Sequence, residues 1–293
     1  MIRSLIAAAL VALAPAAALA QSATPAPAAS ATPAPTASAT PDICSSGLSA
    51  VVSRPTQTTS VCVVKPNHVL LETGYQSQTV DVAGGSYTYQ SAPGATIRIG
   101  TKLRNVELQV LPPSAIRSAG VTASSDAGAG LKWQIRATPG FAYGVNVIAT
   151  APTGSDPLGN PNGLGSASAG TYVYNANVQG SLGKIFGYGA TLSVGRLAAA
   201  GTPSSTRYTS VIPSLDVTVS LPASFGLALE AYRQSNGEGP ATPSHTWFDA
   251  ALSKDAGNAQ FDLNYGTSNR VAPAPGAPGV RRHYVGFGVS YLF

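Results

Sequence analysis

The feature that most constrains this chain is an alternation of apolar and polar side chains with a period of two, repeated from residue 68 to the end of the sequence. Val106, Leu108 and Val110, for example, alternate with Glu107 and Gln109. Successive side chains of a strand point to opposite faces, so each alternating segment predicts a strand with one apolar and one polar face. The same pattern recurs within residues 131–136, 172–179 and 260–265.

About twelve such segments, each of about ten residues, are separated by clusters of Gly, Pro, Asn and Ser. This arrangement predicts an all-β fold. The expected strands cover residues 68–79, 86–101, 105–116, 125–136, 141–152, 169–180, 186–198, 207–220, 223–235, 245–255, 259–270 and 283–293.

The connections between these segments differ in length in a regular way. Those after the even-numbered segments are short, whereas the longest connections, 152–168 and 269–282, follow odd-numbered segments. Transmembrane barrels show this alternation, with short periplasmic turns and longer external loops. Charged residues are only 10% of the chain, against ~25% in soluble domains. We therefore predict a transmembrane antiparallel β-barrel, with a soluble β-sandwich with long loops as the alternative.

The first twenty residues have the form of a cleaved signal peptide. Arg3 supplies the positive charge, an apolar stretch follows, and Ala18 and Ala20 form a small-residue cleavage site. Residues 21–41 are almost wholly Ala, Pro, Ser and Thr and predict a disordered linker, because they cannot build a core. No later apolar run reaches the roughly 20 residues of a spanning helix. These features predict secretion through the inner membrane and a location in the bacterial outer membrane.

Residues 42–67 contain the two cysteines of the chain, Cys44 and Cys62. In an oxidising compartment, two cysteines predict one disulfide. The segment could lie beneath the barrel or fold into it, and its polar composition with Pro55 favours a small periplasmic cap. The cysteines and the few histidines do not form a zinc pattern, so we expect no metal and no cofactor.

The end of the sequence carries a strand with aromatic residues at alternate positions. Phe287, Tyr291 and the final Phe293 share one face with two valines. A strand of this form is similar to the terminal strand that the barrel-assembly machinery recognises, and it seats aromatic rings at the membrane interface. We therefore expect that machinery as a partner.

The polar face of the expected strands carries ten charged residues that would line the barrel lumen. This set fits two interpretations. One is an ion-paired network that fills a narrow barrel, and the other is a hydrated passage with weak charge selectivity. Barrels of ~8 strands are filled by side chains and those of ~16 strands are open, so the strand count leaves both interpretations. The lumen candidates are Glu72, Arg98, Lys102, Glu107, Lys132, Arg136, Asp216, Glu230, Asp249 and Asp262.

A lipid-hydrolysing enzyme is the alternative of a different class, because Ser244 and His245 lie near the expected external rim. Adjacent residues of a strand point to opposite faces, and no acid or amide is spaced to orient the imidazole. We therefore predict that the protein is not an enzyme and has no catalytic residues.

Several short motifs resemble one known family. They are Glu72-Thr73-Gly74-Tyr75, Ile97-Arg98-Ile99-Gly100, Val106-Glu107-Leu108, Gly128-Ala129-Gly130-Leu131-Lys132-Trp133 and Ala151-Pro152-Thr153-Gly154. With these motifs the chain resembles the outer-membrane transporter family labelled MetA pathway of phenol degradation, over residues 62–293. The resemblance implies an outer-membrane barrel of the transporter or channel type, in a family named for aromatic degradation.

The predicted function is therefore a channel or transporter that passes small solutes, including aromatic or hydrophobic ones, through the lumen. The alternative is a non-conducting structural or adhesive barrel. The expected partners are outer-membrane lipid and a small-molecule solute. Positive charge is spread thinly, without a Lys/Arg block, so we expect no nucleic-acid partner. A monomer is expected.

Overall fold

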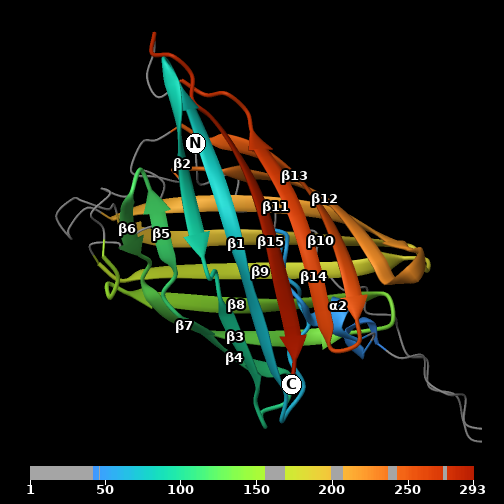
Figure 1. Ribbon diagram of the computed structural model, residues 1–293. Helices are drawn as coiled ribbons and strands as arrows, with labels where there is room; N and C mark the ends of the chain where they lie inside the picture. Colours follow the sequence, from blue (N-terminus) through green and yellow to red (C-terminus); the bar gives the residue numbers. More distant parts are fainter. Residues whose placement is uncertain (1–41, 46, 156–168, 199–206, 237–242, 273–275) are drawn as a thin grey trace, which may run out of the picture. The chain divides into compact units, whose positions relative to one another are not determined.

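The computed structural model describes residues 42–45, 47–155, 169–198, 207–236, 243–272 and 276–293. The predicted signal peptide and linker lie outside these residues. Most of the described chain forms one antiparallel sheet, in which the last strand pairs with the first (Figure 1). The sheet is therefore a closed barrel, as the sequence predicted.

Fifteen strand segments make up this sheet, in the following order along the chain. They are β1 Val69–Val82, β2 Gly85–Ala92, β3 Thr96–Gly100, β4 Val106–Leu111, β5 Ala115–Ser118, β6 Val121–Ser124, β7 Ala127–Ala137, β8 Phe141–Ala151, β9 Thr171–Leu182, β10 Phe186–Ala198, β11 Arg207–Leu221, β12 Phe225–Gln234, β13 His245–Ala256, β14 Ala259–Ser268 and β15 Arg281–Leu292. A short 3-10 turn, η3 Pro222–Ser224, joins β11 to β12.

The barrel has 12 strands, because three of them are interrupted and each counts as two segments. Pro93 separates β2 from β3, and Pro112 and Pro113 separate β4 from β5. Proline has no N–H to donate to a ladder and so breaks the pairing locally. The third interruption, at Ser125 and Asp126, separates β6 from β7. The predicted count of about twelve strands is confirmed.

The two ends of the barrel differ in their connections. At the end where the chain terminates, neighbouring strands are joined by short turns, such as residues 138–140, 183–185 and 257–258. At the other end, β8 and β9 are separated by residues 152–170 and β14 and β15 by residues 269–280. The tight turn between β1 and β2 is an exception at this end, and it uses Gly84 at φ +86°, where a side chain would be strained. In membrane barrels the short turns are periplasmic.

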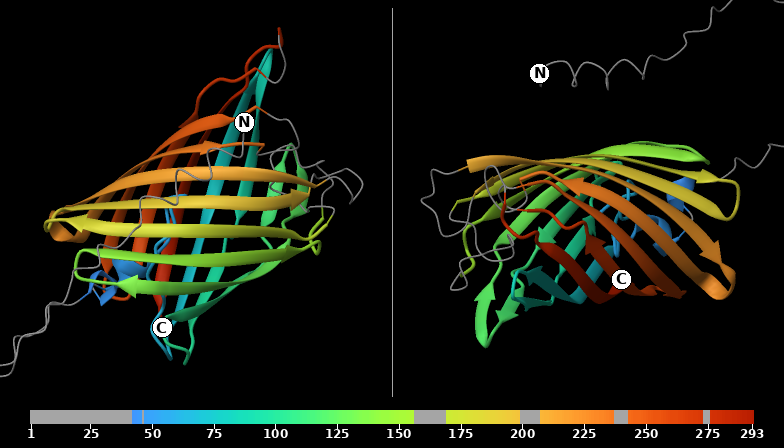
Figure 2. Two further views of the ribbon diagram at one scale, coloured as in Figure 1. Left: turned by 180° about the vertical axis from the view of Figure 1, so that it is seen from behind. Right: turned by 90° about the horizontal axis from the view of Figure 1, so that it is seen from above.

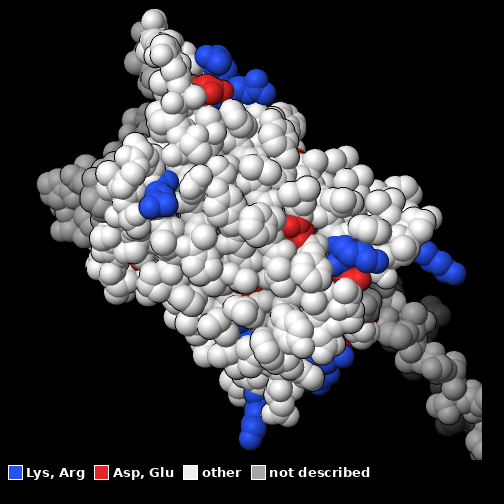
Figure 3. All heavy atoms as spheres, viewed as in Figure 1, with Lys and Arg blue, Asp and Glu red and all other residues white. Residues whose placement is uncertain are grey.

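The outer wall of the barrel is apolar and the inner wall is polar. On β7, Leu131 and Trp133 are each 51% exposed, whereas the intervening Lys132 is 1% exposed. Figure 3 shows that the outer surface over β1, β14 and β15 is largely free of charged side chains. A closed barrel with this exterior satisfies its backbone polar groups internally and presents apolar side chains to lipid. It is therefore a transmembrane barrel.

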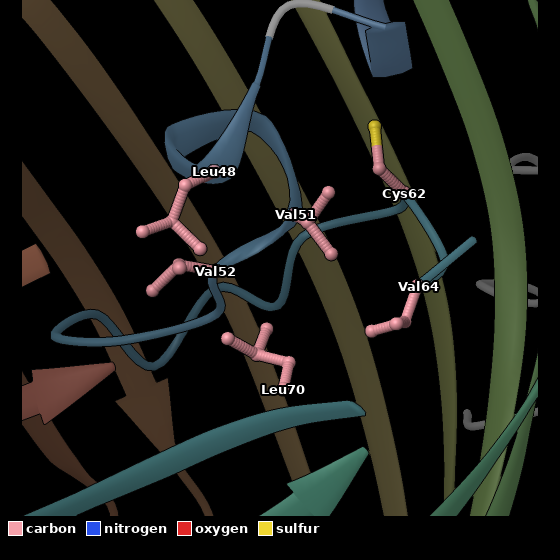
Figure 4. Close-up of a cluster of buried hydrophobic side chains, with 6 residues drawn as sticks. All are labelled: Leu48, Val51, Val52, Cys62, Val64 and Leu70. Atoms are coloured by element: carbon pink, nitrogen blue, oxygen red, sulfur yellow. The ribbon is translucent and has the colours of Figure 1, made fainter. Parts of the chain in front are cut away.

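Residues 42–67 form a compact piece that we call the inner segment. It contains η2 Ile43–Ser45 and α2 Leu48–Val51, and the predicted disulfide between Cys44 and Cys62 is present. Its apolar side chains pack together and against Leu70 at the start of β1 (Figure 4). The members of this cluster are Leu48, Val51, Val52, Cys62, Val64 and Leu70.

The inner segment lies inside the barrel rather than beneath it. Its backbone N–H groups donate to inward side chains of strands around the wall: Thr58 to Glu230 on β12, Val61 to Gln179 on β9 and Val64 to Glu107 on β4. In the right view of Figure 2, its blue ribbon lies within the curve of the sheet. The structure has the segment folded into the barrel, so the small periplasmic cap that its composition favoured is wrong. A polar, irregular backbone needs hydrogen-bond partners when buried, and the lumen supplies them.

Candidate channel interior

One group of lumen side chains is organised around two ion pairs of Arg98, and we call Glu72, Arg98, Glu107 and Lys132 the paired cluster. Arg98 lies at its centre and is 0% exposed. Its Nε is 2.7 Å from Glu107 Oε1 and its Nη2 is 2.9 Å from Glu107 Oε2, while Nη1 is 3.4 Å from Glu72 Oε2. A two-pronged contact between guanidinium and carboxylate is among the strongest in proteins. Lys132 faces Glu107 across the β4–β7 pairing.

The paired cluster also holds the inner segment in place. Arg98 donates to the carbonyl oxygens of Val51 at 2.5 Å and Cys62 at 2.9 Å, and Lys132 donates to that of Ser60 at 2.8 Å. The acids instead accept hydrogen bonds from backbone N–H groups of the inner segment. Glu72, for example, accepts from the Ser53 N–H at 2.6 Å. The bases therefore bind carbonyl groups and the acids bind N–H groups of the same piece of backbone.

A second group lies on the other side of the lumen, and we call Asp216, Glu230 and Asp249 the acidic row. These residues stand directly opposite one another on the adjacent strands β11, β12 and β13. Among the described residues, no Lys or Arg forms an ion pair with any of them. The alternation in the sequence predicted their inward direction but not this alignment, which depends on the register of three strands.

Neutral donors reach the acidic row instead. Glu230 accepts from the N–H groups of Gln57 at 2.7 Å and Thr58 at 2.6 Å, and from the Thr58 hydroxyl at 2.6 Å. Asp249 accepts from the hydroxyl of Tyr284 at 2.5 Å. Glu230 and Asp249 therefore accept from neutral donors, and no Lys or Arg of the described residues pairs with the row.

Eight of the ten predicted lumen residues are buried on the inner wall, and two are not. Lys102 lies exposed in the turn between β3 and β4. Arg136 lies beyond a register shift between Gln134 and Arg136, and it pairs with the outward-facing Tyr143. An extra residue in a strand reverses the faces that follow it. The lumen predictions for Lys102 and Arg136 are therefore wrong, and both lost residues are bases.

Two other bases, which the sequence did not indicate, contribute to the interior. Arg54 of the inner segment reaches Asp262 on β14, with Nε 3.4 Å from Oδ2. Arg282 is buried on β15, and its Nη1 is 2.8 Å from Nε2 of His245. Arg282 could have been found by extending the alternation of the last strand by one residue, whereas nothing local marks Arg54. The imidazole of His245 is thus in contact with a guanidinium.

Two cavities of the lumen border the inner segment. The larger, about 720 Å³, is lined by residues of the short turns such as Gly183 and Lys184, by Thr58, and by Asp216 of the acidic row. It therefore reaches the end of the barrel with the short turns. The smaller, about 180 Å³, lies beyond the tip of the inner segment. It is lined by Arg54, Pro55, Gln57, Tyr232, Asn264 and Tyr284 among others.

Comparisons with known proteins locate the fold among outer-membrane channels. No protein-family model and no curated protein sequence matches the chain. An outer-membrane channel from Pseudomonas putida F1 is similar in structure, with a TM-score of 0.59 and 14% identity, over 79% of this chain and 97% of that one. The NanC porin is similar with a TM-score of 0.50 and 10% identity, over 75% of this chain and 98% of that one.

These neighbours share the barrel architecture, and at such low sequence identity the similarity shows the fold alone. With the apolar exterior and the closed antiparallel sheet, the fold is that of a bacterial outer-membrane barrel, as the sequence predicted. The specific family label remains a prediction. Within the part of the chain that the structure describes, no helix has the length and apolar character of a membrane span.

Proposed function

We propose that this protein is an outer-membrane channel for small solutes, in which the inner segment narrows the lumen to a path between the two cavities. The observation that carries the proposal is the pair of cavities on either side of the segment, one of about 720 Å³ and one of about 180 Å³. Thr58 lines the first, Gln57 lines the second, and Arg54 lines both. The two cavities thus adjoin one another near Arg54.

The cavity walls support passage of small molecules rather than macromolecules. Short polar side chains such as Thr56 line both cavities, and the rings of Tyr232 and Tyr284 line the smaller one. Surfaces of this kind accept polar solutes by hydrogen bonding and planar ones by ring contact. Aromatic or hydrophobic solutes, which the sequence resemblance implied, form the finer part of the proposal.

The test uses two neighbouring alanines of β13. Ala251 is buried and lines the larger cavity, whereas Ala250 faces outward. We expect the mature wild-type protein to give discrete conductance steps in planar bilayers and to admit small sugars and aromatic acids into liposomes. Ala251→Trp should reduce both signals severalfold because the indole fills the cavity, while Ala250→Trp should leave them unchanged.

Two controls distinguish a variant that does not fold from a variant that folds but does not conduct. The heat-dependent shift of the folded barrel on gels reports folding, and Ser253→Phe at the same cavity replaces Ala251→Trp if the larger side chain prevents folding. A folded wild-type barrel that neither conducts nor admits any solute would contradict the channel. The non-conducting structural barrel, which the filled lumen also favours, would then be the better description.

A further inference from the structure

The acidic row needs a counter-charge that the described part of the protein does not supply. Its three carboxylates are 6%, 4% and 7% exposed in the order Asp216, Glu230, Asp249, and like charges directly opposite one another on a sheet are destabilising. The interior bases are engaged elsewhere, since Arg54 pairs with Asp262 and Arg98 with Glu107. A mobile positive charge in the lumen would balance the row.

The row extends from one cavity to the other. Asp216 lines the larger cavity, and Tyr284, which donates to Asp249, lines the smaller one. Glu230 stands between them on the middle strand and binds the N–H groups of both Gln57 and Thr58. The carboxylates thus follow the part of the wall where the inner segment separates the two spaces.

An unpartnered oxygen provides a second and independent observation. Oδ1 of Asp249 is buried and has no hydrogen-bond partner among the described residues, although the residue is more than nine-tenths buried. A buried carboxylate oxygen without a donor is costly unless water or an ion reaches it. A cation at the row would offset the cost of leaving this oxygen without a donor.

Two glycines give the end members of the row their position. Gly189 faces Asp216 across the β10–β11 pairing, and Gly266 faces Asp249 across the β13–β14 pairing. A Cβ at Gly189 would collide with Oδ1 of Asp216, and one at Gly266 would collide with Oδ1 of Asp249. The missing side chains let both carboxylates lie along the wall, with Thr58 beside Gly189 and the ring of Tyr284 beside Gly266.

We propose that the acidic row is a binding site for small monovalent cations, either hydrated alkali ions or the ammonium group of a small amine, on their way between the cavities. The proposal rests on the channel function proposed above and gives it a charge preference. Within the described residues, no three His, Cys, Asp or Glu side chains could jointly hold a metal ion. The row is thus a series of weak sites along a wall, as in charge-selective pores, and not a chelating centre.

The first experiment measures the reversal potential of the full mature protein in a planar bilayer under a tenfold KCl gradient. We expect a preference for K⁺ over Cl⁻ on the order of tenfold, because several carboxylates act on one ion at short range. In Asp216→Asn with Asp249→Asn, the ratio should fall to about two or less while conductance remains. Glu230 is left intact because it holds the inner segment.

The matched control is Asp81→Asn, which removes one carboxylate from β1 that lies outside the row and is 3.6 Å from His283. We expect it to keep the wild-type selectivity. A wild-type channel that prefers Cl⁻ or has no preference would overturn the cation site and leave the channel function standing. Equal selectivity in the wild type and the double variant would overturn it as well.

A barrel that does not conduct would count against the channel function, and a second measurement then decides the cation site. A ligand that binds only the folded protein raises its melting temperature. The wild type should therefore gain more thermal stability in KCl than in N-methylglucamine chloride of equal ionic strength, and Asp216→Asn with Asp249→Asn should lose this difference. The same response in both proteins would overturn the site.

Discussion

The paired cluster and the acidic row lie in the same lumen and solve the problem of buried charge in different ways. In the paired cluster, two carboxylates share Arg98, Lys132 faces one of them, and the backbone of the inner segment satisfies the remaining groups. In the acidic row, Glu230 and Asp249 receive only neutral donors, and no Lys or Arg of the described residues pairs with any of the three carboxylates. A cluster without net charge suits a structural anchor, whereas a charged wall beside a cavity suits a mobile ligand. One barrel interior can therefore hold the inner segment through ion-paired side chains on one side and present acidic side chains beside a cavity on the other.

The largest expected effect comes from breaking the paired cluster. Arg98→Met leaves Glu72 and Glu107 without their guanidinium, and removing one partner of a buried pair costs about 3–5 kcal/mol. The free energy of unfolding in lipid vesicles, followed by urea titration, measures this loss. Ile97→Met on the outward face is the matched control and should change little.

A double-mutant cycle sharpens this result. Glu107→Gln in the Arg98→Met background should recover part of the loss, because it removes one of the two uncompensated charges. If the free energy of unfolding of Arg98→Met lies within about 1 kcal/mol of the wild-type value, the paired cluster is hydrated. It would then not be a structural anchor, and its contrast with the acidic row would fail.

The second effect tests whether the inner segment depends on its disulfide. Removing a disulfide of this loop length costs about 3 kcal/mol, so Cys44→Ala with Cys62→Ala should speed amide exchange in the inner segment roughly a hundredfold. Hydrogen exchange at the N–H groups of Thr58 and Val64 reports this opening. Exchange in β8–β10 should stay as in the wild type, and a uniform acceleration along the whole chain would contradict a local role.

The smallest effect is expected in the acidic row. Asp249→Asn keeps an acceptor for the Tyr284 hydroxyl and removes one of three like charges, so it should stabilise the barrel in low salt by at most about 1 kcal/mol. The same urea titration, at low and high KCl, measures it, and the gain should shrink as salt rises. A loss as large as that of Arg98→Met would mean that the row is anchored by ion pairs after all.

The sequence predicted the wall of this barrel far better than its contents. The alternation of Leu131, Lys132 and Trp133 is a local property of one strand, so the strands and most inward residues followed from it. Arg136 failed because a single register shift reverses the faces, and such a shift has no clear local signature. The row and the inner segment depend on contacts such as that between Thr58 and Glu230, which are 172 residues apart. No local pattern encodes a contact of that kind.

The position of Arg54 has a consequence for how the barrel is sealed. The barrel closes where β1 meets β15, which joins the first strand to the last. Arg54 contacts both sides of this seam, since its N–H donates to Glu72 on β1 and its guanidinium reaches Asp262 on β14. The inner segment thus bridges the seam, so that the closed barrel is held there by side chains from within as well as by the main-chain ladder.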